Sequence, residues 1–180
     1  LGPFLGPKMP FFPVFSAVKT FFKKTTSVRD LLEYFREFKT VFFGIDAPVN
    51  PKNIELIEWC RIFAKEGLAP KYGKKSSHGN LSFRTKSGMI ITRSGSDLSA
   101  LQESELVEVT DCDEKKFSAK ARGLFDPSSE SFEHFEIYHL RKEINALFHG
   151  HSSQILGQAK KLRLVETKAD KDINTPNVGV

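Results

Sequence analysis

The sequence predicts an α/β domain built around a mostly antiparallel sheet. A helical pattern ends at Gly67, a hairpin pattern lies within residues 81–92, and two further strand patterns run to residue 122. A second helix and a last strand then complete the order helix, hairpin, strands, helix, strand. The chain has 180 residues, which is enough for one domain with a sizeable core.

The first helix of this domain is predicted from an apolar stripe at helical spacing. The stripe consists of Leu56, Trp59, Cys60, Phe63 and Ala64. Gly67 is a good residue for ending the helix. Because Cys60 lies on the stripe, we expect a packed core thiol rather than a nucleophile.

The middle of the chain has strand and turn signals. Residues 81–84 and 89–92 read as strands joined by a turn at Lys86-Ser87-Gly88. Residues 105–109 alternate like a strand, and residues 116–122 form a weaker strand pattern after an acidic turn at 111–113. We expect a loop at 71–78 and one helical turn within 98–104.

The N-terminal part has a different composition. Residues 1–26 are rich in Phe, Pro and Gly and are predicted to form a solvated arm. A helix is expected from Thr26 to about Lys39, and residues 47–51 read as a linker. The sequence therefore divides into an arm with a helix (residues 1–50) and a second domain (51–180).

Composition narrows the classes of function. The net charge of +5 is compatible with phosphorylated substrates, but the dispersed Lys and Arg residues form no nucleic-acid motif. Cys60 and Cys112 lie far apart, which favours free thiols and a reducing, cytoplasmic compartment over a disulfide framework. No apolar run approaches the roughly 18 residues of a membrane span.

The stretch from Pro127 to His151 contains the candidate chemistry. Pro127 and two serines precede Glu130, which is typical of a helix start, and the helical pattern runs to about Asn145. A strand is expected to begin at Ala146-Leu147-Phe148. Because alternate residues of a strand share a face, His149 and His151 should point to one place. Two such imidazoles are a common arrangement for holding zinc, although two surface histidines would give the same pattern.

Several motifs occur in one order along the chain. They are Gly79-Asn80-Leu81-Ser82-Phe83-Arg84, Ile91-Thr92-Arg93-Ser94-Gly95, Pro127-Ser128-Ser129-Glu130 and Ala146-Leu147-Phe148-His149-Gly150-His151. From about Asn53 onward the sequence resembles the class II aldolase/adducin family. The resemblance implies a three-layer αβα sandwich with a mostly antiparallel central sheet. It also implies a cytoplasmic homotetramer of carbohydrate metabolism that acts as a metal-dependent lyase on a small phosphorylated sugar.

The resemblance also assigns roles to residues. Glu130 would be the catalytic acid/base, and His149 and His151 would bind Zn²⁺ or another divalent ion such as Mn²⁺ or Co²⁺. The implied phosphate-binding residues are Gly79, Asn80, Ser94, Gly95, Ser128 and Ser129. The family often has proline where this chain has Arg93, which could either add charge to the phosphate site or point to solvent.

The sequence leaves alternative functions open. The family takes a third metal-binding histidine from a segment beyond the His-x-His strand, and no histidine follows His151 in this sequence. A non-catalytic, adducin-like interaction module is therefore the alternative, as is a related dehydratase or epimerase. We expect His134 and Tyr138 to pack against the sheet, and His78 and His139 to lie at the surface or behind the metal ligands.

Overall fold

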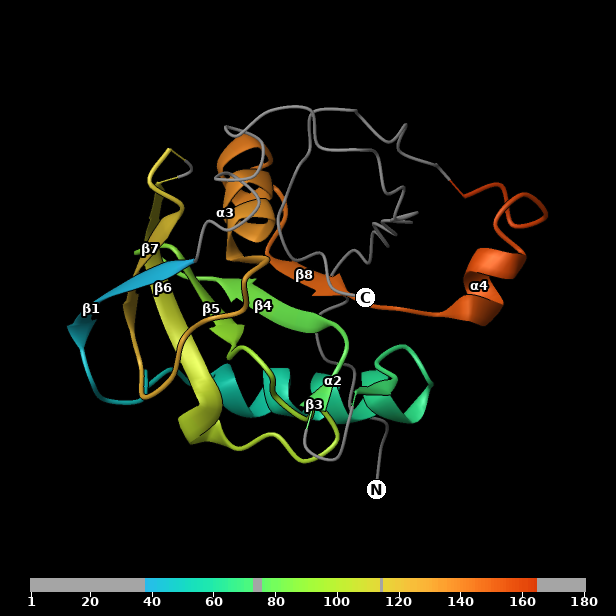
Figure 1. Ribbon diagram of the computed structural model, residues 1–180, viewed down its shortest axis with the longest axis horizontal. Coiled ribbons are helices and arrows are strands. Elements are labelled where there is room, and N and C mark those ends of the chain that lie inside the picture. The colour runs from blue at the N-terminus through green and yellow to red at the C-terminus, as the bar shows by residue number, and fades with distance from the viewer. Residues whose placement is uncertain (1–37, 73–75, 114, 165–180) are drawn as a thin grey trace, which may run out of the picture.

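A six-stranded sheet forms the centre of the molecule, seen in a computed structural model that describes residues 38–72, 76–113 and 115–164 (Figure 1). In sheet order the strands are β1 (Lys39–Gly44), β7 (Ser118–Arg122), β6 (Leu106–Asp113), β5 (Met89–Thr92), β4 (Asn80–Arg84) and β8 (Ala146–His149). A separate two-stranded ribbon consists of β2 (Lys71–Tyr72) and β3 (Ser76–Ser77). The helices are α2 (Asn53–Lys65), α3 (Ser131–Leu140), α4 (Ser153–Gly157) and the short 3₁₀ helix η1 (Glu103–Glu105).

The sheet is mixed. β1 runs parallel to β7, whereas the pairs β7–β6, β6–β5, β5–β4 and β4–β8 are antiparallel. The hairpin expected at residues 81–92 is confirmed as β4 and β5, in which Phe83 pairs with Ile90. The predicted α/β class is therefore confirmed.

The two faces of the sheet pack against different helices. On one face α2 places Leu56, Cys60 and Phe63 against apolar residues that include Leu81 and Ile90. On the other face α3 packs Tyr138 into a cluster with Met89, Ile91, Val107 and Leu147. Figure 1 shows α2 and α3 on opposite sides of the strands. The alternation of side chains along each strand supplies both cores, since Ile90 and Ile91 point to opposite faces.

The helix α2 confirms most of its predicted stripe. Cys60 is fully buried, and burial raises the pKa of its thiol to about 12, so it is a packed core thiol. Trp59 is an exception, because 41% of it is exposed while Ile57 is buried in its place. The buried face follows positions 56, 57, 60 and 63, which places Trp59 at the margin of the contact with the sheet.

Three predicted boundaries were wrong. The helix α3 ends at Leu140 rather than about Asn145, because Arg84 holds the chain beyond it by donating to the carbonyls of Arg141 (2.8 Å) and Ile144 (2.9 Å). The expected acidic turn at 111–113 belongs to β6, which pairs with β7 through a register shift between Val109 and Asp111. The loop expected at 71–78 contains β2 and β3.

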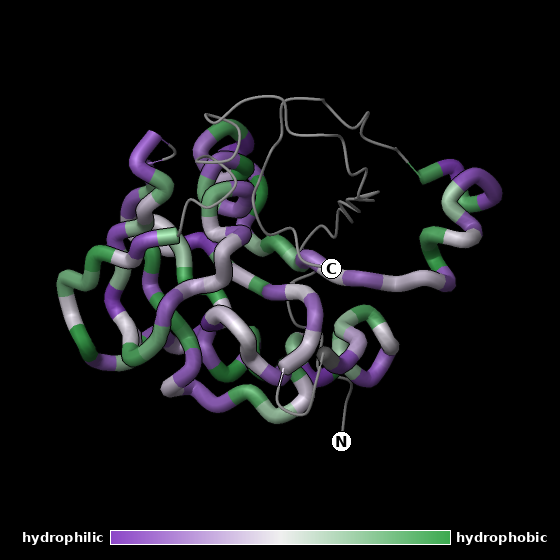
Figure 2. Tube along the Cα trace, viewed as in Figure 1, coloured by the Kyte–Doolittle hydropathy of each residue, from purple (hydrophilic) through white to green (hydrophobic). Residues whose placement is uncertain are grey.

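The edge strand β1 was not predicted. Its residues Val41, Phe42 and Phe43 are exposed, and Figure 2 shows this hydrophobic run. β1 lies before residue 51, yet it pairs with β7 in the central sheet. The division into residues 1–50 and 51–180 stays a prediction. The arm at 1–26 and nearly all of the helix expected at 26–39 lie outside the described residues. Within the described residues, no helix has the length and apolar character needed to cross a membrane.

Candidate functional site

A polar pocket lies at the end of the sheet where β4 begins and where β5 and β8 end. Its volume is about 140 Å³. The lining residues come from four segments: Ser77, His78, Gly79, Asn80; Arg93, Ser94, Gly95, Ser96; Ser128, Ser129, Glu130; and His151. The pocket thus brings together eight of the nine residues that the sequence singled out, and the ninth, His149, adjoins it through its contacts with Glu130 and His151.

The two histidines converge as expected, although only His149 lies in β8. Their Nε2 atoms are 3.0 Å apart, and the N–H group of His151 donates to the carbonyl of Leu68 (2.8 Å). The residue between them must be small. A Cβ on Gly150 would lie 2.5 Å from the ring of Phe63 and 2.8 Å from the Leu68 carbonyl oxygen. The His-Gly-His sequence is therefore tied to the packing of α2.

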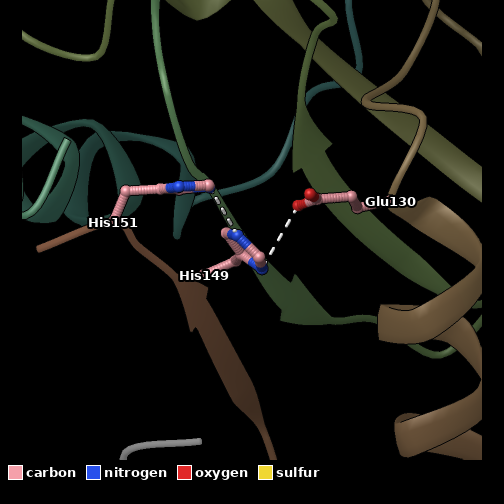
Figure 3. Close-up of side chains that lie close together, drawn as sticks. All are labelled: Glu130, His149 and His151. Atoms are coloured by element: carbon pink, nitrogen blue, oxygen red, sulfur yellow. Dashed lines mark hydrogen bonds and ion pairs between the residues drawn. The ribbon is translucent and has the colours of Figure 1, made fainter. Parts of the chain in front are cut away.

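Glu130 approaches the same pair from the start of α3. Its Oε2 lies 3.3 Å from Nδ1 of His149 and also accepts a hydrogen bond from Nδ2 of Asn80. Figure 3 shows His151 and Glu130 reaching the His149 ring from opposite sides. We assign the Nδ1–H tautomer to His149, because Nδ1 lies beside the Glu130 carboxylate. This tautomer leaves the Nε2 lone pair facing His151.

These three side chains fit a divalent ion. Ligand atoms of Glu130, His149 and His151 all lie within 4.8 Å of one another. The 3.0 Å separation of the Nε2 atoms is less than twice a Zn–N bond of ~2.0–2.1 Å, so one ion can reach both nitrogens. Burial, together with the rings of His149 and His78, lowers the pKa of His151 and favours the neutral imidazole that binds metals.

Other residues that line the pocket offer hydrogen-bond donors. Among the described residues, no acceptor lies within hydrogen-bonding distance of the N–H groups of Gly95, Ser96 and Ser129. The hydroxyl groups of Ser94 and Ser129 face no partner there either. Ser129 also lies just before α3, where a helix start carries partial positive charge. These residues can therefore receive an anion.

A glycine directly precedes strand β4, where the chain passes close to the end of β8. Gly79 has φ +90°, and a Cβ there would lie 2.6 Å from the carbonyl oxygen of His149. The next residue, Asn80, pairs with His149 across the two strands and is only 4% exposed. Its Oδ1 atom is buried and has no hydrogen-bond partner among the described residues.

A buried polar cluster lies next to Glu130, on the candidate metal-binding side of the pocket formed by Glu130, His149 and His151. The hydroxyl of Ser82 lies 2.7 Å from Nδ1 of His134 and 2.9 Å from the Tyr138 oxygen. His134 and Tyr138 pack against the sheet as expected, with 4% and 3% exposure. Burial lowers the pKa of His134 to about 3 and raises that of Tyr138. Asn80 and Ser82, two apart in β4, thus contact Glu130, which directly precedes α3, and His134, which lies in its first turn.

The remaining histidines lie in different settings. His139 is exposed. His78 is half-buried and lines the pocket, with its ring centroid 4.9 Å from that of His151, the same as the separation of the His149 and His151 rings. Sequence reasoning missed Ser77 and Ser96 as pocket residues. They meet because the Ser77 N–H donates to the Ser96 carbonyl (2.9 Å), a long-range contact with no local signal.

The fold and site define a class of protein: an α/β domain with a candidate metal centre beside a donor-rich pocket. Residues 54–172 match the model of the class II aldolase and adducin N-terminal domain. The chain belongs to this family.

Two relatives give the extent of the match. The chain is 34% identical over 103 residues to L-fuculose phosphate aldolase of Haemophilus influenzae, covering 57% of this chain and 43% of that protein. A solved structure of L-fuculose-1-phosphate aldolase from Thermus thermophilus has 26% identity and a TM-score of 0.45, with 58% of this chain and 48% of that chain covered. The chain spans about half the length of the relatives that it matches.

Proposed function

We propose that this protein is a divalent-metal-dependent aldolase-type lyase that cleaves a small phosphorylated sugar through an enediolate. The observation that carries the proposal is one pocket that is lined both by Glu130 and His151 and by the donor groups of Gly95 and Ser129. A ligand with a carbonyl at one end and a phosphate at the other has matching chemistry. The name of the Haemophilus influenzae relative agrees with such a substrate.

The metal side would supply the chemistry. His149 and His151 would hold the ion through their Nε2 atoms, with Glu130 beside them. When bound, a divalent ion polarises a carbonyl and stabilises the negative charge of an enediolate. Zn²⁺, Mn²⁺ and Co²⁺ suit this donor set.

Glu130 would move the proton. Asn80 donates to its carboxylate and His149 lies beside the same oxygen, so the group is held at the pocket wall. In that position it would donate a proton to the substrate carbon next to the carbonyl after the carbon–carbon bond has broken, while the hydroxyl proton of the leaving fragment passes to solvent as the aldehyde forms. Gly79, Asn80, Ser94, Gly95, Ser128 and Ser129 would line the phosphate end.

Assembly and domain limits belong to the same proposal. We propose a homotetramer, as the family resemblance implies, and a three-layer αβα sandwich for the complete domain. We also keep the division between residues 1–50 and 51–180 as a prediction.

Metal analysis with an assay tests the proposed function. The purified chain is expected to bind about one Zn²⁺, Mn²⁺ or Co²⁺ ion and to release an aldehyde from a phosphorylated ketose such as L-fuculose 1-phosphate. A chain that takes up no metal when all three ions are offered would contradict the proposal. That result would favour the alternative, a non-catalytic adducin-like interaction module. Turnover that yields a dehydrated or epimerised product would favour the other alternative.

A further inference from the structure

Arg93 is the only strongly basic residue among those that line the pocket, and the proposed function leaves it unused. It follows β5 directly and precedes the turn at Ser94-Gly95, and its side chain is 25% exposed. Among the lining residues it alone carries a permanent positive charge, and Glu130 is the only carboxylate. We propose that Arg93 makes the pocket select a doubly charged phosphate monoester over a singly charged or neutral group. This inference rests on the proposed function, because it concerns the same pocket.

The guanidinium of Arg93 is fixed by three contacts. Its Nε atom donates to Oε1 of Glu105 (2.7 Å), and its Nη1 atom donates to the carbonyl of Ser94 (2.8 Å). The guanidinium carbon also lies 4.8 Å from the centre of the Phe125 ring. A planar guanidinium held in this way loses little conformational entropy when it binds an anion.

Donors remain on this group after those contacts. Arg93 has five N–H bonds, of which Glu105 and Ser94 take two. The Nη2 atom has no acceptor among the described residues, and Nη1 lies against Gly95, 3.9 Å from where a Cβ would be. The free donors of Arg93 and the free N–H groups of Gly95 and Ser96 therefore belong to one turn.

Glu105 partly neutralises the positive charge of Arg93, and its carboxylate oxygens already have donors of their own. It accepts from Arg93 and also from the N–H group of Gln102 (2.9 Å), so both carboxylate oxygens are engaged. The ion pair of Arg93 and Glu105 therefore carries no net charge. A neutral ligand group gains no electrostatic attraction from this ion pair. The second negative charge of a phosphate, by contrast, interacts directly with the guanidinium.

Binding of inorganic phosphate and of acetate, measured by calorimetry on the full chain at constant metal concentration, tests the inference. Arg93→Gln is expected to weaken phosphate binding by about 10–100-fold and acetate binding much less. Glu105→Gln should bind phosphate at least as tightly as the parent, because it leaves the guanidinium charge uncompensated. Arg141→Gln is the matched control, since Arg141 pairs with Glu143 (2.6 Å) on the surface and does not line the pocket. Its phosphate affinity should stay within twofold of the parent.

The Arg93→Gln variant leaves the carboxylate of Glu105 without its cation, so the double variant Arg93→Gln/Glu105→Gln removes that charge as well. The double variant is expected to lose phosphate affinity as the single variant does. Phosphate affinity within twofold of the parent in the double variant would overturn the inference, as would a parent chain that binds no phosphate.

Activity separates this inference from the proposed function. Arg93-dependent phosphate binding without any lyase turnover would support the role of Arg93 and contradict the lyase. Turnover with a KM that is the same in the parent and in the double variant would support the lyase and overturn the role of Arg93. A raised KM with little change in kcat is the expected result.

Discussion

The two sides of the pocket are built from different kinds of structure. The proposed metal side consists of side chains at the ends of regular elements: His149 closes β8, and Glu130 precedes α3. The anion side consists mainly of backbone N–H groups and hydroxyls in turns, such as that at Gly95, where φ is +64°. Substitutions on the metal side should therefore abolish chemistry, whereas those on the anion side should weaken binding by smaller factors.

His149→Ala should have the largest effect. The variant removes both ring nitrogens of His149: Nε2, which faces His151, and Nδ1, which lies beside Glu130. We therefore expect loss of the bound ion and of all turnover. Metal content by mass spectrometry and an aldehyde assay measure both. His139→Ala, which changes an exposed histidine on α3, should leave both values unchanged. A His149→Ala chain that keeps its metal would show that the metal side lies elsewhere.

Glu130→Gln tests the separation of metal binding from proton transfer. The variant keeps nearly the same size and the hydrogen-bonding reach, so the fold and most of the metal content should survive. Turnover should fall by about 10²–10⁴-fold, the usual share of general acid–base catalysis. Activity within a few-fold of the parent at equal metal occupancy would reject the role given to Glu130, leaving a first-turn acid worth about 0.3–1 kcal/mol of stability.

The buried cluster under the metal side predicts a pH dependence of stability. The pKa of His134 is about 3 in the fold, below the ~6.5 of an unfolded chain, so the unfolded state binds more protons between these values. The contribution of neutral His134 to the free energy of unfolding is complete above about pH 6.5 and is lost as the pH falls toward 3. We expect His134→Asn to remove about 1–2 kcal/mol of the change in unfolding free energy between pH 7 and 5.

Urea unfolding at the two pH values measures this contribution. His139→Gln is the matched control, because His139 is exposed on the same helix and its loss should leave the pH dependence as in the parent. If the His134→Asn variant shows the same pH dependence as the parent, the buried neutral state assigned to His134 is incorrect.

Ser129→Ala should have the smallest effect, on the anion side. Its hydroxyl has no partner among the described residues, so the fold should be unaffected. The loss of one hydrogen bond to phosphate should raise KM by about 3–10-fold at nearly constant kcat. Ser104→Ala in η1 serves as the control. A large fall in kcat for Ser129→Ala would contradict the division of the pocket into a chemical side and a binding side.

Local patterns were enough for several elements and for the residues that the structure brings together in the pocket. The alternation in β4 and β5, the apolar stripe of α2 and the serine-rich start of α3 are local signals, and the structure has these elements where they were expected. The His-x-His spacing also predicted the convergence of His149 and His151. Local patterns failed at Trp59, at the end of α3 and at β1, because each depends on a distant partner: the sheet margin, the side chain of Arg84 and the strand β7.

By itself, the sequence singled out the candidate site residues, since residue types and short spacings are local properties. Only the tertiary structure decided how those residues meet. The pairing of β4 with β8 places Asn80 opposite His149, and the packing of α3 against β4 brings Glu130 to both. The anchoring of Arg93 by Glu105 and Phe125 depends likewise on segments 12 and 32 residues away along the chain. Contacts over such separations follow from burying both faces of the sheet, and no pattern within a few residues encodes them.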